Sequence, residues 1–209
     1  MSEYRLIMFN EGIDAMRKTL MACAIGVAIA QSGVVQAEEN WMWRVRAIHI
    51  APDTSSAPVA GVDASSETVP ELDFTYFISK NVGVELVLAT SRHQVSLNGA
   101  NLGKVSLLPP TLTLQYHFTQ SEKIKPYVGA GINYTRFYSM GLNSPLDVER
   151  NSWGGALQAG VDVALDKSSY INFDVKKLYI ETYVRSGGAY LTTFKINPMV
   201  WGVGYGRRF

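Results

Sequence analysis

The C-terminal segment, residues 199–209, constrains the fold of this chain most strongly. Its residues alternate between two kinds, and a β-strand places alternate side chains on opposite faces. One face carries large and mostly apolar side chains, and the other carries small or charged residues. The first consists of Met199, Trp201, Val203, Tyr205, Arg207 and Phe209, and the second of Val200, Gly202, Gly204, Gly206 and Arg208. This pattern predicts the closing strand of a membrane β-barrel, with the apolar face towards lipid and little room inside.

The alternative for this segment is the edge strand of a soluble sheet. That arrangement would expose Trp201, Tyr205 and Phe209 beside unpaired backbone, which soluble proteins avoid. Charged residues make up 18% of the chain, and the mean hydropathy is only +0.02. A barrel explains both values, because alternating strands dilute their apolar face with polar residues. The net charge is +1 without a basic run, which indicates no nucleic-acid partner.

Residues 1–37 are predicted to be an N-terminal extension followed by a cleavable signal peptide. A positive segment at 16–18 precedes an apolar run at 20–30, and residues 35–37 fit a cleavage site. The apolar run has eleven residues, whereas a membrane-spanning helix needs about 20. Cleavage leaves one domain, residues 38–209, which we expect in the outer membrane of a Gram-negative cell.

The segment to be removed contains two further features. Either Met1 or Met16 is the true start, and we favour Met16 because the residues before it resemble neither a signal nor a fold. Cys23 is the only cysteine, so the domain after cleavage has neither a disulfide scaffold nor a thiolate metal site. We expect no metal and no cofactor. Lipidation of Cys23 is disfavoured, because the apolar run follows this residue instead of preceding it.

The sequence predicts an all-β fold, an eight-stranded antiparallel transmembrane β-barrel. The expected strands cover residues 41–50, 70–79, 82–90, 106–118, 126–137, 152–165, 169–183 and 190–209. Short turns alternate with polar loops, which are expected at 51–69, 91–105, 138–151 and 186–188. Outer-membrane barrels have this layout, with short periplasmic turns and longer outer loops. A lipocalin-like cup is the soluble rival with eight strands, but it keeps its polar face outside.

The residues that face inward near the periplasmic end are polar or charged. An eight-stranded barrel is narrow and filled by side chains, and buried charges are very costly unless they are paired. We therefore predict a polar plug in the lumen, which excludes a general water-filled porin. The same network would also hold the barrel together. The plug is expected to consist of Arg44, Arg46, Glu85, His117, Asp162, Asp174 and Arg208.

Nearer the outer end, the inward residues become apolar, which predicts a pocket for a small hydrophobic molecule. The alternative is that the assignment of residues to the inward and outward faces shifts by one near the strand ends, where predicted boundaries are least reliable. The predicted ligand-channel residues are Ile48, Ile50, Val87, Ala89, Leu178 and Ile180.

A lateral opening is predicted at Leu108, Pro109 and Pro110. Proline has no N–H for a strand ladder, so two in succession interrupt pairing with a neighbour. Unpaired backbone at membrane depth is tolerated only where it lines a cavity or meets protein. The alternative is a strand that simply begins at Thr111. Pro198 predicts a second interruption, in the last strand.

Several segments resemble the outer membrane protein W (OmpW) family. The matching stretches are Leu72–Tyr76, Asn81–Leu86, Leu108–Leu112, Pro126–Thr135, Ser152–Gly154, Gly160–Asp162, Asn197–Pro198 and the aromatic C-terminus. The resemblance implies an eight-stranded barrel that acts as a channel for small hydrophobic compounds, with a lateral opening at the Leu-Pro-Pro segment. The family usually ends in Gly-Tyr-Arg-Phe, whereas Arg207 takes the third-last place here. The first and fourth loops match poorly, so the resemblance does not specify the ligand.

We therefore expect a passive outer-membrane channel that admits small hydrophobic molecules into the apolar lumen and releases them sideways into lipid. Its expected partners are outer-membrane lipid, these solutes, and the barrel-assembly machinery through the C-terminal strand. A structural or surface-binding barrel is the alternative. A lipid A acylase or deacylase would need a His with a Ser and an acid at the membrane rim. His49 and His93 are expected near the outer rim, and Ser91 and Ser96 are close to His93 in the sequence. No family motif surrounds either histidine, so an enzyme is not expected.

Overall fold

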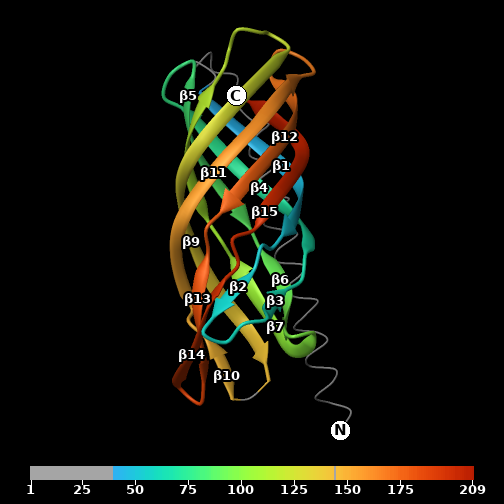
Figure 1. Cartoon of the computed structure of the whole chain (residues 1–209). Helices are drawn as coiled ribbons and strands as arrows, with labels where there is room; N and C mark the ends of the chain where they lie inside the picture. Colours follow the sequence, from blue (N-terminus) through green and yellow to red (C-terminus); the bar gives the residue numbers. More distant parts are fainter. Residues whose placement is uncertain (1–39, 144) are drawn as a thin grey trace, which may run out of the picture. The chain divides into compact units, whose positions relative to one another are not determined.

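The computed structural model describes residues 40–143 and 145–209, so the predicted extension and signal peptide lie outside the described residues. Fifteen strands are present within these two ranges, and eight of them form a closed antiparallel barrel (Figure 1). Around the barrel these are β11 (Asn151–Ala164), β12 (Ser169–Leu178), β15 (Met199–Arg208), β1 (Trp41–Ala51), β4 (Glu67–Phe77), β5 (Val82–Ala89), β8 (Thr111–His117) and β9 (Ile124–Leu142), which pairs with β11. The described part of the chain contains no helix that could cross a membrane.

The first and last barrel strands close the barrel, as the C-terminal pattern predicts. β1 and β15 pair antiparallel from Met42 with Arg208 to Ala51 with Met199. At their ends, the Trp41 N–H donates to the Phe209 carbonyl at 3.1 Å, and the Phe209 N–H donates to the Trp41 carbonyl at 2.7 Å. The terminal aromatic residue therefore belongs to the barrel seam.

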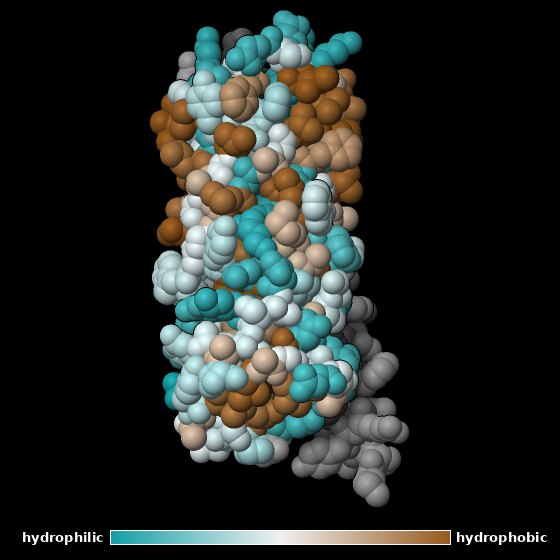
Figure 2. Space-filling model, viewed as in Figure 1, coloured by the Kyte–Doolittle hydropathy of each residue, from teal (hydrophilic) through white to brown (hydrophobic). Residues whose placement is uncertain are grey.

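The outer surface of the barrel is apolar where the predicted outward face lies. Leu114 is 57% exposed and Trp201 is 56% exposed, values that suit contact with lipid and not with water. Figure 2 shows apolar side chains over the barrel wall. Aromatic pairs border this band, as in outer-membrane barrels: Trp41 with Tyr76 at the turn end, with ring centroids 4.9 Å apart, and Tyr134 with Trp153 at the other end, 4.8 Å apart.

Short turns join the strands at the end that holds the C-terminus. In the turn between β11 and β12, Asp166 Oδ1 accepts the backbone N–H groups of Ser168 at 2.9 Å and Ser169 at 2.8 Å. These hydrogen bonds lower the pKa of the Asp166 carboxyl below its ordinary value. The turn is thus fixed by a side chain that remains charged at neutral pH.

Beyond the barrel, the chain forms further strands at the opposite end, in two sheets (Figure 1). Three continue the barrel sheet from β9: β7 (Ala100–Leu108), β6 (Ser91–Leu97) and β3 (Val62–Ala64). The other sheet is formed by β10 (Leu146–Val148), β13 (Glu181–Ser186), β14 (Ala189–Lys195) and β2 (Ser55–Ala57). The predicted loop at 91–105 is therefore wrong, because this segment is largely the hairpin of β6 and β7.

The predicted strands 106–118, 169–183 and 190–209 are each interrupted. The first breaks at residues 109–110, between β7 and β8, and the others break at 179–180 and 196–198. Pro198 and the positive φ of 33° at Asn197 explain the last break, because proline cannot donate to a ladder and few residues adopt a positive φ. Both proline segments thus divide barrel strands from outer strands.

Candidate functional site

A network of buried charges fills the half of the lumen nearer the short turns, which we call the lower lumen. Arg44 lies at the centre of this network. Its guanidinium Nε lies 3.0 Å from Asp73 Oδ1, and Nη2 lies 2.8 Å from Glu85 Oε1. Nη1 is 3.3 Å from Asp162 Oδ2. The Arg44 side chain is completely buried, so these carboxylates together offset the large cost of removing its charge from water.

Arg46 makes a second centre one pleat further along β1. Its Nε lies 2.7 Å from Glu71 Oε1, and its Nη2 lies 2.6 Å from Asp73 Oδ2. Lys176 extends the network, with its Nζ 2.9 Å from Glu71 Oε1 and 2.6 Å from Asp174 Oδ1. Asp73 therefore joins the two arginines, and Glu71 joins Arg46 to Lys176.

Neutral side chains supply the remaining hydrogen bonds to the carboxylates. The Tyr127 hydroxyl donates to Asp174 Oδ2 at 2.6 Å, and Gln158 Nε2 donates to the same oxygen at 2.8 Å. Asn172 Nδ2 donates to Asp162 Oδ1 at 2.8 Å. The plug is thus a connected network of charges and amides, in which a single missing partner would leave a buried charge uncompensated.

Two predicted plug residues lie nearer the turn end, on aromatic rings. His117 stacks on Tyr127 with ring centroids 4.9 Å apart, and its Nε2 is 2.9 Å from Gln115 Oε1. The guanidinium of Arg208 lies 3.9 Å from the centre of the Phe77 ring. The other five predicted residues belong to the charge network described above, and their role as a barrier to transport remains a proposal.

Three charged members of the plug were missed from the sequence: Glu71, Asp73 and Lys176. The signal was present, because Leu72 and Phe74 face outward on β4 and Val175 faces outward on β12, so the residues next to them in these strands must point inward.

The glycines of the closing strand make room for the arginines. A Cβ at Gly204 would lie 2.6 Å from Arg46 Cγ, and a Cβ at Gly206 would lie 2.5 Å from Arg44 Cγ. Real Cβ atoms do not approach so closely. Glycine is therefore required on the inward face of β15, because Arg44 and Arg46 on β1 occupy the space next to it.

Between the plug and the outer strands lies an inner cavity of about 40 Å³. Its floor is formed by Glu71 and Lys176, which are paired with each other. All six predicted ligand-channel residues line it, namely Ile48, Ile50, Val87, Ala89, Leu178 and Ile180. Pro109 lines the same cavity, whereas Leu108 points outward and is 38% exposed. The structure thus brings the predicted pocket and one predicted wall residue together.

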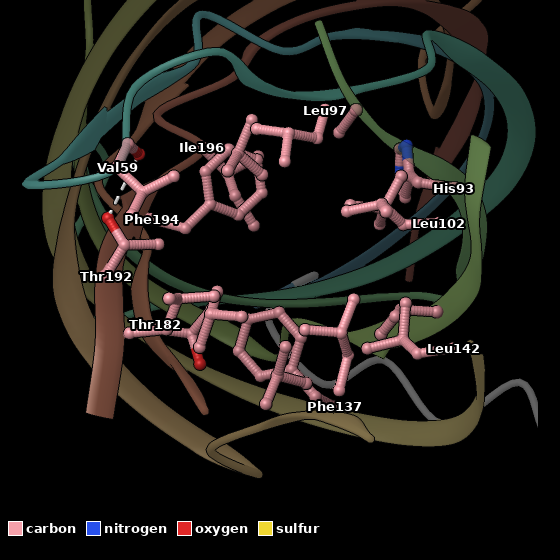
Figure 3. A pocket seen from close by; sticks show the side chains of 18 of the residues that line it. Val59, His93, Leu97, Leu102, Phe137, Leu142, Thr182, Thr192, Phe194 and Ile196 are labelled. Carbon is pink, nitrogen blue, oxygen red and sulfur yellow. Dashed lines mark hydrogen bonds between the residues drawn. The ribbon is translucent and has the colours of Figure 1, made fainter. Parts of the chain in front are cut away.

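An outer cavity of about 80 Å³ lies between the two outer sheets, and its lining is almost wholly apolar. Figure 3 shows Phe194, Ile196 and Leu97 on one side of the hollow and Phe137 and Leu142 on another. These residues were not predicted as a site, because outside the bilayer the pattern reverses: polar side chains face outward and apolar ones face the interior. The remaining apolar lining includes Val59, Val62, Val95, Leu102, Val105, Val148, Val184 and Leu191.

The two cavities meet at a neck. His93, Leu107 and Ile196 line both of them. Each of these side chains is buried. The two cavities therefore adjoin, and these three side chains lie between them.

The wall of the inner cavity is interrupted beside Pro109 and Pro110. The ladder between β5 and β8 ends at Val87 and Thr111, and the ladder between β6 and β7 begins at Ser91 and Leu107. Between these pairs, neither proline has an N–H to donate across the gap. The gap lies at the level of the aromatic residues that border the outer side of the lipid-facing band, because Tyr134 N–H donates to the Pro110 carbonyl at 3.0 Å.

The second interruption, at Pro198, is bridged by hydrogen bonds. The Leu178 N–H donates to the Pro198 carbonyl at 3.1 Å, and the Ile196 N–H donates to the Ile180 carbonyl at 2.9 Å. Asn197 Oδ1 accepts the Ile180 N–H at 3.1 Å. This second interruption is therefore bridged by two backbone bonds and one side-chain bond, whereas the ladder between β5 and β8 stops at Thr111, before the two prolines.

The closed barrel, its lipid-facing band and its filled lumen define an outer-membrane β-barrel protein. The sequence pattern of the OmpW family matches residues 37–209. The chain therefore belongs to the OmpW family, and it resides in the outer membrane of Gram-negative cells.

Individual proteins of known name agree with this assignment. The chain is 40% identical over 197 residues to the uncharacterized outer-membrane protein y4mB of Sinorhizobium fredii, covering 88% of this chain and 86% of the relative. It is 28% identical to the dibenzothiophene metabolism operon protein PahQ of Pseudomonas aeruginosa, over 82% of this chain and 90% of that protein. The crystal structure of the outer membrane protein OprG from Pseudomonas aeruginosa superposes with a TM-score of 0.70 and 30% identity, covering 81% of this chain and 95% of that one.

Proposed function

We propose that this barrel is a passive channel through which small hydrophobic molecules cross the outer leaflet and leave sideways into lipid. One observation carries the proposal. Pro109 lines the inner cavity at the place where the barrel wall loses its ladder between β5 and β8. The alternative outlet, below the cavity, leads through the charged plug.

The route begins in the outer cavity, which offers an apolar surface away from water. Its volume of about 80 Å³ is smaller than that of an apolar cavity of about 150 Å³ that holds benzene. A solute must therefore displace side chains as it passes the neck at His93, Leu107 and Ile196. The connections between the barrel and the outer strands are interrupted at 109–110, 179–180 and 196–198, whereas β9 continues without a break, and these interruptions support such movement.

The floor of the inner cavity prevents passage to the periplasm. To move further down, a solute would have to separate Glu71 from Lys176 and then displace Arg46. Breaking a buried ion pair costs about 3–5 kcal/mol, and an apolar solute returns no hydrogen bonds to the separated charges. The lateral path past Pro109 involves no such separation.

No energy source is required. Transfer of an apolar molecule into hydrocarbon is favourable by about 0.8 kcal/mol per CH₂, so partition into the membrane drives the last step. The name of the relative PahQ refers to an operon for the metabolism of dibenzothiophene, which is a small and apolar aromatic molecule. This name supports a small hydrophobic solute.

We also propose that the chain is not an enzyme. His93 Nε2 lies 2.8 Å from Ser91 Oγ, which is the start of a catalytic arrangement. However, His93 Nδ1 meets the backbone carbonyl of Ser65 at 2.6 Å, where a triad has a carboxylate. The other rim histidine, His49, is bonded through Nδ1 to the Thr68 hydroxyl.

Blocking the neck tests transport. Leu107→Trp adds bulk where the cavities meet, and Leu114→Trp adds the same bulk on the lipid-facing side, where Leu114 is exposed. Uptake of a small terpene would be followed in cells whose lipopolysaccharide leaflet slows direct diffusion. We expect Leu107→Trp to lower uptake at least fivefold and Leu114→Trp to leave it unchanged, with assembly checked by gel mobility without boiling.

Two results would count against the proposal. If Leu107→Trp assembles and transports like the wild type, the solute does not pass the neck. If cells with the wild-type barrel take up no more terpene than cells without it, the barrel has a structural or surface-binding role instead.

A further inference from the structure

We propose that Ser91 and His93 form a hydrogen-bonding site for the solute, so that the preferred solutes are small hydrophobic alcohols or phenols. The inference rests on the proposed function, because it assigns a solute class to the same passage. Ser91 lines the inner cavity, and His93 lines both cavities at the neck. A solute that moves between the cavities must pass this pair.

The hydrogen bonds of His93 define which atoms of the pair are donors. Its Nδ1 lies 2.6 Å from the Ser65 carbonyl, and a carbonyl only accepts, so Nδ1 carries a proton. In the neutral ring Nε2 is then an acceptor, and it receives the Ser91 hydroxyl proton at 2.8 Å. The Ser91 oxygen keeps its lone pairs, and it can accept a hydrogen bond from a solute hydroxyl.

The other hydroxyl groups along the route are committed to backbone carbonyls. Thr182 donates to the Glu149 carbonyl at 2.9 Å in the outer cavity. Thr192 donates to the Val59 carbonyl at 3.2 Å, drawn as a dashed line in Figure 3. These threonines satisfy carbonyls at the edges of the outer sheets. Their oxygens keep lone pairs as well, but both threonines line only the outer cavity, whereas Ser91 lines the inner cavity beside the neck.

Thr111, on the other side of the inner cavity, is also committed. It donates to the Pro109 carbonyl at 3.0 Å, and it accepts the Asn133 amide at 2.8 Å. Thr111 Oγ1 thus already accepts a hydrogen bond, whereas no described residue donates to Ser91 Oγ, so its lone pairs remain open to a solute.

The surroundings of the pair strengthen such a bond. Ser91 is 6% exposed and His93 is 4% exposed, and their neighbours at the neck are Leu107 and Ile196. Water competes poorly with a solute for an acceptor in such surroundings. A hydrocarbon can also pass, because the Ser91 proton is already bonded to His93, but it gains nothing from the acceptor.

The test compares two solutes of nearly the same shape, 4-ethylphenol and 4-ethyltoluene, in which a hydroxyl replaces a methyl group. Their dissociation constants would be measured by NMR titration of the protein in lipid nanodiscs, with empty nanodiscs as the blank. The readout is the ratio of the two constants, in which a general loss of binding cancels. Ser91→Val replaces the hydroxyl with a methyl group and adds a second methyl group on Cβ, and Ser91→Thr adds the same second methyl group but keeps the hydroxyl.

We expect the preference for the phenol to be about fivefold greater in the wild type and in Ser91→Thr than in Ser91→Val. Fivefold corresponds to about 1 kcal/mol, at 1.4 kcal/mol per tenfold, as for a neutral hydrogen bond. An equal ratio of the two dissociation constants in all three proteins would overturn the hydroxyl site but not the proposed channel. Failure of both solutes to bind the wild type overturns the channel as well.

A second measurement on the wild type alone covers the case in which Ser91→Val fails to assemble. In protein with ¹⁵N-labelled histidine, the His93 Nε2 resonance should shift when 4-ethylphenol binds. The phenol donates to Ser91 Oγ and so polarises the Ser91 O–H, which is itself bonded to His93 Nε2. 4-Ethyltoluene should cause a smaller shift. The same response to both solutes would overturn the proposal.

Discussion

The Tyr134 N–H donates to the Pro110 carbonyl at 3.0 Å, so the interrupted strand remains attached to β9 on one side. Asn133 reinforces this side, because its Nδ2 donates to the Thr111 hydroxyl at 2.8 Å. The other side, towards β5, has no proline N–H to close it. The weakness in the wall is therefore one-sided, and the prolines can separate from β5 without leaving β9.

Thr90 holds the free side of this gap closed. Its hydroxyl donates to the Leu107 carbonyl at 3.2 Å and also contacts the Tyr138 hydroxyl on β9. Thr90→Val keeps the shape and removes these bonds, each worth about 0.5–1.5 kcal/mol. The two bonds together are worth about 1–3 kcal/mol, so we expect solute uptake to rise at least about fivefold in a whole-cell assay. Tyr138→Phe removes only the bond to β9 and should give a smaller rise; reduced uptake in both variants would contradict this role of Thr90.

The plug should be sensitive to the loss of one charge. Lys176→Met removes one of the two cations next to Glu71 and Asp174, which should destabilise the barrel by about 3–5 kcal/mol in urea unfolding from lipid vesicles. The control is Arg185→Met, because Arg185 pairs with Glu149 at 3.9 Å and both side chains are 45% exposed. An exposed pair contributes about 0–1 kcal/mol. Equal losses of stability in the two variants would contradict the account of the plug.

The closing strand should not tolerate a side chain at Gly204. In Gly204→Ala the new Cβ would lie 2.1 Å from the Val45 carbonyl oxygen, which belongs to backbone and cannot move aside. Overpacking of this kind costs about 1–3 kcal/mol, so the fraction of folded barrel in detergent refolding should fall. Gly155→Ala is the control, because its Cβ would meet Tyr179 at an ordinary 3.6 Å. A Gly204→Ala barrel as stable as the control would show that β1 and β15 are packed less tightly.

Much of the barrel could be predicted from the sequence because lipid imposes a simple rule. In the membrane the outward face must be apolar, so Trp201, Val203 and Tyr205 identified one face, and Gly204 identified the other. The same rule failed outside the membrane. In β6 and β7 the outward residues are polar, as Arg92 illustrates, and the hairpin was mistaken for a loop.

The site was predictable to a similar extent. The inward apolar residues and Pro109 could be named from strand direction, and they line one cavity. The neck could not be named, because His93 and Ile196 come together only through the pairing of outer strands with the barrel. The bridging of the second break by Asn197 was also beyond the sequence, because it depends on a side chain meeting the Ile180 backbone.

The lateral exit is tested most directly by restoring the missing backbone donors. Pro109→Val with Pro110→Val supplies two N–H groups and residues that favour strands, so β8 can extend along β5. Pro126→Val, at the start of β9 far from the cavities, is the control. In the double variant we expect terpene uptake to fall at least fivefold while terpene binding, measured by NMR in nanodiscs, is retained. Wild-type uptake by a correctly assembled double variant would show that the solute does not leave past Pro109 and Pro110.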